Sequence, residues 1–196
     1  MTSPIVLDPF TAADFGRLIA WVLDAESLMQ WAGPRFRWPL DEQQLALYLA
    51  GAEGPTPERV VFKARLADGA SLSTRAGVDV GLADPVIGHV ELNNLDPQNG
   101  SATLSRVLIG PREARGLGLG EHLVAVVVDH GFRDLGLHRI DLGVFDFNQA
   151  AIRCYERVGF RREGLLGDSR RMGESYWSLI VMALLEDEWR RGREEM

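Results

Sequence analysis

The chain has 196 residues, of which 46% are hydrophobic and 25% charged, with 21 Lys and Arg against 28 Asp and Glu. This composition is typical of a folded globular protein and excludes a disordered, collagen-like or membrane-embedded chain. The net charge of −7 also removes the general attraction to phosphate backbones on which most nucleic-acid binders depend. We therefore expect a single domain over residues 1–196, with neither nucleic acid nor membrane as a partner.

Cysteine usage and the chain ends bear on the cellular compartment. The single cysteine, Cys154, cannot form an internal disulfide, and no Cys and His residues stand at the spacing of a zinc site, so we expect no metal. The first residues lack a basic segment followed by an apolar one. The apolar run at 179–185 is far shorter than the roughly 20 residues that span a bilayer. These features favour a cytoplasmic protein.

In the first half of the chain, short strands alternate with two helices. The predicted elements are a strand at 5–10, a helix capped by Thr11, a helix from Asp41 to Gly51, a strand at 59–66, and strands at 86–92 and 102–109 that flank the hairpin signal Asn99-Gly100. Residues 31–39 are rich in aromatic and turn residues. Residues 67–85 are rich in Gly, Ala, Asp and Ser, which favours a surface excursion or a small hairpin.

The second half of the chain predicts a β-α-β-α unit, which makes the domain a mixed α/β one. A glycine-rich turn leads into a helix with Val124, Val128 and Phe132 at helical spacing. The elements that follow are a strand at 140–144, a helix at 148–158 closed by Gly159, strands at 160–163 and 177–185, and a charged helix from Glu186.

The most specific local motif is the glycine-rich loop Arg115-Gly-Leu-Gly-Leu-Gly120, which lies between a predicted strand and a long apolar helix. Alternating glycines let the backbone approach a ligand, and the first turn of the helix presents free N–H groups to an anion such as pyrophosphate. A flexible turn is the alternative. The loop does not match a dinucleotide fingerprint, because Glu121 stands where glycine is required, and it lacks the Lys-Ser or Lys-Thr pair of a nucleotide triphosphate loop.

Four features in register resemble the GNAT superfamily of acetyl-CoA-dependent N-acetyltransferases: the strand at 107–109, the Arg-x-x-Gly-x-Gly loop, the helix from Asn148, and the run Tyr155-x-x-x-Gly-Phe-x-x-Glu-Gly. Within this superfamily the chain is similar to the branch that includes the ribosomal-protein alanine N-acetyltransferases. The resemblance implies an α/β fold with a twisted, mixed, mostly antiparallel sheet of about seven strands, flanked by helices and splayed in the middle. Acetyl-CoA would enter between the strands at 107–109 and 140–145.

The resemblance also implies a set of cofactor contacts. Where the strands part, backbone amides lose their partners and can bind the pantetheine arm, while the glycine loop holds the pyrophosphate. Arg115 is either an extra contact or a solvated charge. Asn148 and Tyr155 are two helical turns apart on one face, although a plain N-cap and a core aromatic are the alternatives. The expected cofactor-binding residues are Val107, Leu108, Ile109, Arg115, Gly116, Leu117, Gly118, Leu119, Gly120, Asn148 and Tyr155.

Two residues are the candidates for acid and base. By resemblance Tyr155 is the general acid for the leaving thiolate, and full proton transfer from an ordinary tyrosine to that thiolate is uphill by roughly 2 kcal/mol. The main-chain N–H near Leu108 would polarise the thioester carbonyl. Glu91 is the candidate base, because it lies on a predicted strand and shares a face with His89. A solvated glutamate beside a structural histidine is the alternative.

The acceptor side is expected at the aromatic segment. The expected substrate-binding residues are Trp31, Phe36, Trp38 and His89, although the aromatics could instead pin a helix connection to the core. The acidic first half would suit a cationic amine. We discard Cys154 as a nucleophile, because no histidine is placed to activate it.

The expected function is direct transfer of the acetyl group of acetyl-CoA to a primary amine, by a monomer or a homodimer and without a covalent enzyme intermediate. The acceptor could be a protein N-terminus, a polyamine, an aminoglycoside or another small amine. The alternatives are a non-catalytic acyl-CoA-binding module and a nucleotide-phosphate binder that uses the same loop.

Overall fold

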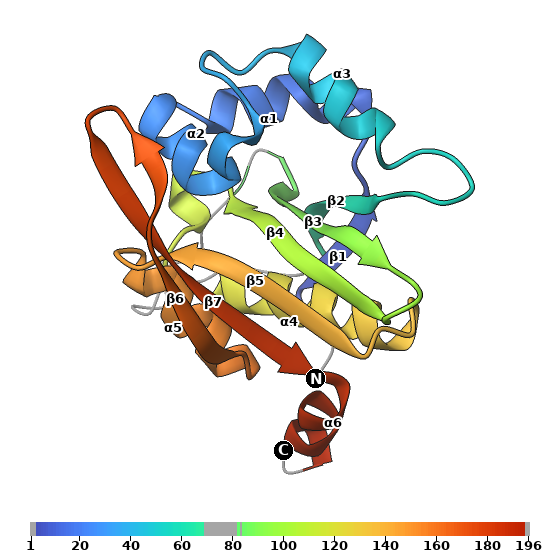
Figure 1. Ribbon diagram of the computed structural model, residues 1–196. Coiled ribbons are helices and arrows are strands. Elements are labelled where there is room, and N and C mark those ends of the chain that lie inside the picture. Colours follow the sequence, from blue (N-terminus) through green and yellow to red (C-terminus); the bar gives the residue numbers. More distant parts are fainter. Residues whose placement is uncertain (1–2, 69–81, 83, 195–196) are drawn as a thin grey trace.

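The computed structural model describes residues 3–68, 82 and 84–194. Within this part of the chain, seven strands form one sheet in the order β1-β2-β3-β4-β5-β7-β6 (Figure 1). The strands are β1 (Ile5–Pro9), β2 (Arg59–Leu66), β3 (Val86–Asp96), β4 (Ser101–Ile109), β5 (Arg139–Phe145), β6 (Arg161–Met172) and β7 (Ser175–Leu185). The pair β4/β5 is parallel and the other neighbouring pairs are antiparallel, which confirms the predicted mixed, mostly antiparallel sheet.

Helices cover both faces of the sheet (Figure 1). The helices are α1 (Phe15–Trp21), α2 (Ala25–Ala32), α3 (Glu42–Ala50), α4 (Leu119–Arg133), α5 (Gln149–Val158) and α6 (Glu186–Glu194), with short 3-10 turns η1 (Ala12–Asp14), η2 (Gly33–Arg35) and η3 (Arg112–Ala114). One buried apolar cluster joins α1–α3 to the sheet through residues such as Leu18, Leu45 and Val61. A second cluster joins α4 and α5 to the other face through residues such as Val127 and Ile152.

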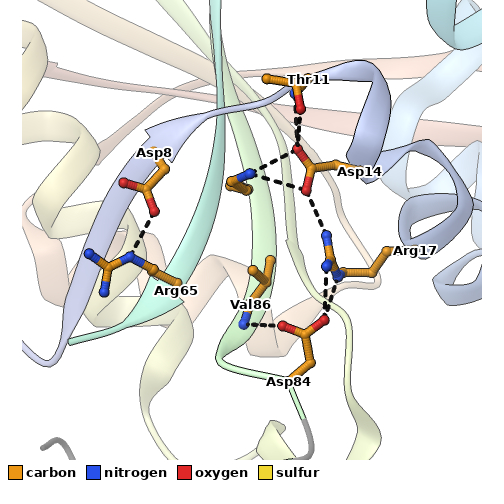
Figure 2. A network of polar contacts seen from close by, with 8 residues as sticks. Asp8, Thr11, Asp14, Arg17, Arg65, Asp84 and Val86 are labelled. Atoms are coloured by element: carbon orange, nitrogen blue, oxygen red, sulfur yellow. Dashed lines mark hydrogen bonds and ion pairs between the residues drawn. The ribbon is translucent and has the colours of Figure 1, made fainter. Parts of the chain in front are cut away.

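A buried carboxylate ties the first helical turn to the sheet (Figure 2). Asp14 is 4% exposed and accepts hydrogen bonds from Thr11, from Arg17 at 2.6 Å and from Lys63 on β2 at 3.1 Å. Burial raises the pKa of Asp14, but these hydrogen bonds outweigh it, so the pKa lies below its ordinary value. Arg17 also binds Asp84, just before β3, at 2.9 Å. The network anchors the α1–α3 layer over the strands that carry the candidate site.

The structure departs from the predicted elements at two places. Helix α2 was not predicted, because it has only eight residues and buries just Leu28 and Ala32, which is too few for a clear apolar period. The predicted strand at 160–163 is instead the twelve-residue β6, an edge strand that is largely exposed and so has no apolar alternation to mark its length. The predicted excursion at 67–85 falls mostly outside the described residues.

Among the described residues, no helix is both long and apolar enough to cross a bilayer. In the same part of the chain, no three His, Cys, Asp or Glu side chains are grouped so that they could hold a metal ion.

Candidate active site

The two central strands, β4 and β5, diverge after three residue pairs. Residues 101–103 of β4 lie opposite residues 139–141 of β5, and beyond Thr103 the parallel pairing ends although both strands continue, β4 to Ile109 and β5 to Phe145. Backbone groups on the diverging edges therefore lack strand partners. The splay that the resemblance implied is confirmed.

Three cavities open along this splay. The central cavity, of about 250 Å³, lies between the diverging strands and is bordered by the ends of α2 and α5. The loop cavity, of about 390 Å³, lies between the glycine-rich loop and α5. The strand-end cavity, of about 410 Å³, lies between the end of β4 and the α1–α2 connection. Val107 lines all three cavities, which we therefore describe as one groove, and Tyr155 lines the central and loop cavities.

A β-bulge in β4 shapes the junction. The register to β3 shifts between His89 and Glu91, and Arg106 on the opposite strand has a φ of 52°. The displaced carbonyl of Arg106 accepts a hydrogen bond from Trp31 Nε1 at 2.9 Å and contacts His89 Nδ1 at 3.3 Å. Because a trans peptide is planar, the N–H of Val107 points away from this carbonyl and its two partners. Trp31 and His89 thereby fix the direction of the Val107 amide.

Only some of the amides in 107–109 face the gap. The Gly110 N–H donates to Ile87 O on β3 at 2.9 Å, and Leu108 lies opposite His89. Since amides alternate along an antiparallel ladder, the Leu108 N–H faces β3 and the Ile109 N–H faces the diverging side. The expectation that three successive amides lose their partners thus needs correction. Val107 and Ile109 are the residues whose amides are available, and Leu108 points its N–H into the sheet.

The glycine-rich loop presents backbone to the loop cavity. Gly116 and Gly118 have φ values of 76° and 82°, and a Cβ at either position would meet nothing within 4 Å. Gly118 is the N-cap of α4, so the first free amides of a fifteen-residue helix open toward this space. Leu119 is 3% exposed and Leu117 packs against the same core, which anchors the loop beneath its glycines. Gly120 also lines the cavity.

Arg115 was expected to be either a cofactor contact or a solvated charge, and the structure shows it bound to main-chain carbonyls. Its Nε donates to Ile109 O and its Nη2 donates to Gly110 O, both at 2.9 Å. These carbonyls stand at the end of β4, where β5 has diverged and cannot supply donors. The guanidinium is therefore not a freely solvated charge: it braces the strand end while lining the loop and strand-end cavities.

Helix α5 carries the other two predicted residues. Asn148 is its N-cap and accepts from the Ala151 N–H at 3.2 Å, and it lines the central and strand-end cavities as well. Burial, with the neighbouring Cys154 as a smaller cause, raises the pKa of Tyr155 well above its ordinary value. Burial, then Glu121, raises the pKa of Cys154 to about 11. Tyr155 therefore keeps its proton at neutral pH, and Cys154 remains a thiol.

The structure brings one of the four predicted acceptor-side residues to the groove. Trp31 lines the central and strand-end cavities. Phe36 is buried, with its ring stacked on Trp31 at 5.8 Å, and Trp38 is 46% exposed. His89 is 1% exposed, and burial lowers its pKa to about 3, so the ring is neutral. Within the described residues, the three cavities are not lined by Phe36, Trp38 or His89.

Glu91 lies behind the bulge rather than in the groove. Its side chain is fully buried and pairs with the Arg106 guanidinium, which lies over the rings of Phe36 at 5.9 Å and Tyr48 at 5.4 Å. Burial, followed by the charges of Arg35 and Arg59, lowers the pKa of Arg106 to about 10, so it stays charged at neutral pH. Glu91 is not among the described residues that line the three cavities.

Sequence reasoning missed two arginines of the central cavity, Arg106 and Arg170. Arg106 reaches the site because β4 bulges, and a bulge has no apolar signature. Arg170 lies on the part of β6 that was not predicted as a strand. The only available signal for Arg170 was its place in the polar run before β7.

These features together define the class of protein: a mixed sheet splayed beside a glycine-capped helix is the acetyltransferase type of fold. A family model described as an acetyltransferase (GNAT) domain matches residues 5–161, so the chain belongs to the GNAT acetyltransferase family.

Individual relatives agree with this assignment. An uncharacterized N-acetyltransferase, p20, of Bacillus licheniformis is 30% identical over 117 residues, covering 60% of this chain and 65% of the relative. The spermidine N(1)-acetyltransferase of Vibrio cholerae is 32% identical over 104 residues, covering 53% of this chain and 59% of the relative. The matched stretches thus span less than two thirds of these relatives' own length.

The fold is also similar to solved structures. The crystal structure of spermidine N-acetyltransferase from Vibrio cholerae in complex with CoA and spermine has a TM-score of 0.74 at 21% identity, covering 96% of this chain and 99% of that one. The similar fold includes the mixed seven-stranded sheet with its flanking helices.

Proposed function

We propose that this protein transfers the acetyl group of acetyl-CoA directly to a primary amine. The observation that carries the proposal is that three cavities share Val107, and two of them share Tyr155, where β4 and β5 diverge beside the glycine-rich loop. Membership in the GNAT family and the names of the relatives support it. The proposed cytoplasmic location rests on the free Cys154 thiol, and we retain a monomer or a homodimer as the working state.

The described residues fit acetyl-CoA by two tests. The open space at Gly116 and Gly118 is room that a side chain would fill, beside the free amides of α4. The diverging edge of β4 offers amides of Val107 and Ile109 to an extended amide-bearing arm. We propose that Gly116, Gly118 and Gly120 hold the pyrophosphate and that the β4 edge holds the pantetheine arm.

The chemistry then centres on the junction. When bound, acetyl-CoA supplies an acetyl thioester that a neutral amine can attack. The Val107 N–H, whose direction Trp31 and His89 fix through the Arg106 carbonyl, stabilises negative charge on the carbonyl oxygen. This proposal specifies the main-chain N–H near Leu108 as that of Val107, because the Leu108 N–H faces β3.

Tyr155 is the proposed general acid. Burial holds its hydroxyl in the protonated form, so the proton needed by the departing sulfur is present at neutral pH. The same burial makes complete transfer to a thiolate less favourable than from an ordinary tyrosine. We infer that Tyr155 acts first as a hydrogen-bond donor to the sulfur and that its proton moves late.

We propose two roles for Glu91, as a counter-ion and as the general base. As the buried partner of Arg106, it balances a charge at the bulge. To act as the base it must receive the amine proton through a water relay, since its carboxylate lies behind Arg106 and away from the cavity linings described here.

Two acceptor classes are proposed. One is a protein N-terminus, as in the ribosomal-protein alanine N-acetyltransferases, and the other is a polyamine. The named spermidine relative supports a small amine, and the resemblance supports a protein N-terminus.

Acetyl-CoA binding and transfer test the proposal in two steps. At equal concentration, acetyl-CoA should raise the melting temperature far more than ATP or NAD, because a ligand at about 100 times its Kd stabilises the native state by about 2.7 kcal/mol. Radiolabelled acetyl-CoA should then acetylate at least one primary amine. Equal shifts with all three ligands would refute the cofactor assignment, and binding without transfer to any amine would indicate a non-catalytic module.

A further inference from the structure

The central cavity is the part of the groove left for the acceptor, if the proposed function holds. The loop cavity accounts for the pyrophosphate end of acetyl-CoA, and its reactive end reaches Val107 and Tyr155. On the far side of these two residues lies the central cavity, bordered by α2, β5, β6 and β7. At about 250 Å³ it is smaller than the roughly 300–1,000 Å³ of drug-sized ligand sites, which favours a small acceptor.

The charges that line this cavity are positive. Among its described lining residues, the charged ones are Arg106 and Arg170, and there is no Asp or Glu. The neutral polar residues are Gln30, Ser105 and Asn148, and the remaining wall is mostly apolar. A polyamine would bring several ammonium groups against the Arg170 guanidinium, with no carboxylate among the described lining residues to receive them, and like charges at close range oppose binding.

The two arginines differ in their partners. Arg106 already has a counter-ion in Glu91. Arg170 donates from Nη1 to its neighbour's carbonyl, Ser169 O, at 2.8 Å, and no carboxylate in the described chain lies within ion-pair distance of it. Arg170 therefore offers a guanidinium fork to an external anion.

The placement of Arg170 depends on a second strained bulge. The register between β6 and β7 shifts between Leu166 and Arg170, and within it Asp168 has a φ of 46° while its N–H donates to Ser178 Oγ at 3.0 Å. Bulges re-aim side chains, and strained backbone is concentrated at functional sites. Asp168 itself is exposed and is not among the described residues that line the central cavity. Figure 1 shows the β6–β7 hairpin extending past the sheet toward the level of α2.

Of the three non-glycine residues with positive φ in the described chain, Arg106 lines this cavity and Asp168 lies two residues before its lining residue Arg170. Each of the two bulges places an arginine among the lining residues, and of these two Arg170 is the one without a carboxylate partner in the described chain. We propose that the acceptor is a small amine that carries an anionic group, a carboxylate or a phosphate, on the same molecule, and that Arg170 binds this anionic group. The acceptor class thus differs from that of the spermidine-named relatives.

Matched acceptors test the proposal with the full-length chain and acetyl-CoA. The probes are the L-amino acids against their α-amides, phosphoethanolamine against ethanolamine, spermidine, and a neutral tripeptide amide. The readout is kcat/KM from release of the CoA thiol. We expect at least one carboxylate- or phosphate-bearing amine to exceed its neutral counterpart and spermidine by about 10-fold or more. The carboxylate and phosphate pairs show which anion is the natural one.

Variants at two neighbouring arginines then assign the effect. Arg170→Gln should lower kcat/KM for the anionic acceptor about 10-fold, mainly through the acceptor KM, with the KM for acetyl-CoA unchanged. Arg170→Glu should shift the preference toward spermidine. Arg171→Gln is the matched control, because Arg171 is exposed on the same strand, donates to Gly173 O and is not among the described lining residues.

Two results would overturn the acceptor class: spermidine or the neutral tripeptide as the best substrate, or an unchanged acceptor preference in Arg170→Glu. Failure of the underlying function gives a different pattern, namely no thermal stabilisation by acetyl-CoA and no transfer to any probe. Stabilisation by acetyl-CoA together with transfer to neutral or polycationic amines alone refutes only the anionic acceptor.

Discussion

The indole Nε1 of Trp31 donates a 2.9 Å hydrogen bond to the main-chain carbonyl of Arg106, 75 residues further along the chain. This bond joins α2 to the bulge of β4 and, through the planar peptide, sets the direction of the Val107 amide. Trp31, which was predicted to bind the substrate, thus also fixes the backbone geometry of the site.

Trp31→Phe keeps an aromatic ring, although a smaller one, and removes the indole N–H donor. We expect kcat to fall about 10-fold while the KM for acetyl-CoA stays within about 2-fold, because the Val107 amide is less firmly held where charge develops. The unfolding free energy should fall by about 1 kcal/mol. Trp38→Phe is the control, since Trp38 is 46% exposed and lies away from the groove. A wild-type kcat in folded Trp31→Phe would contradict the positioning role.

Gly118→Ala tests the phosphate loop. A Cβ there meets open space in the protein, but the φ of 82° makes alanine unfavourable by about 1–2 kcal/mol and places a methyl group where the proposed pyrophosphate lies. Gly136→Ala is a matched control, with a φ of 64°, equal space and no place in the groove. Both variants should lose similar stability by urea unfolding, and only Gly118→Ala should weaken acetyl-CoA binding in calorimetry, by about 10-fold. Equal affinities would remove the loop from the binding site.

Tyr155→Phe tests the general acid. We expect kcat to fall by about 10²–10⁴ with little change in acetyl-CoA affinity, because the hydroxyl acts on the departing sulfur rather than on binding. Since burial raises the pKa of Tyr155, the wild-type enzyme should keep its acid in the active form up to at least about pH 10. Tyr176→Phe, at an exposed tyrosine of β7, is the control. Activity retained in Tyr155→Phe would assign the proton to another donor.

Glu91→Gln leaves the Arg106 guanidinium buried without its counter-ion, and we expect a loss of about 3–5 kcal/mol in unfolding free energy. Replacing both residues, Glu91→Gln with Arg106→Met, should restore most of that loss. The pH–rate profile of the folded variants separates the two proposed roles of Glu91. A rate that falls at neutral pH and recovers partly in alkali is the signature of a lost base, and a profile of wild-type shape leaves only the counter-ion role.

His89 should make stability depend on pH in a definite direction. Burial lowers its pKa to about 3 in the folded chain, against about 6.5 unfolded, so the unfolded state binds more protons between these values. The contribution is present above about pH 6.5 and is lost as the pH falls. Between pH 6.5 and 5 the loss should be about 1.5 kcal/mol, at a slope approaching 1.4 kcal/mol per pH unit. Urea unfolding of His89→Gln should lack this component, and identical slopes would show that His89 is not buried neutral.

Local patterns were enough to predict the elements that carry the proposed cofactor site. The glycines of the loop, the Asn148 cap and the αL closure at Gly159 each satisfy a requirement of a few neighbouring residues, and α4 has an unambiguous apolar period. The resemblance to GNAT acetyltransferases added the mixed, mostly antiparallel sheet and the splay between the two central strands, and both are confirmed.

The acceptor side was decided by tertiary structure. The bulges at Arg106 and Asp168, the pairing of Glu91 with Arg106 and the contact of Trp31 with a distant carbonyl all arise from strand register and from burial by segments far apart in the chain. A one-residue shift in register turns every side chain to the opposite face, and no short window of sequence records such a shift. The sequence therefore determined the glycine-rich loop and the helix cap where we propose that acetyl-CoA binds, whereas only the folded sheet decided which charges line the cavity proposed for the amine.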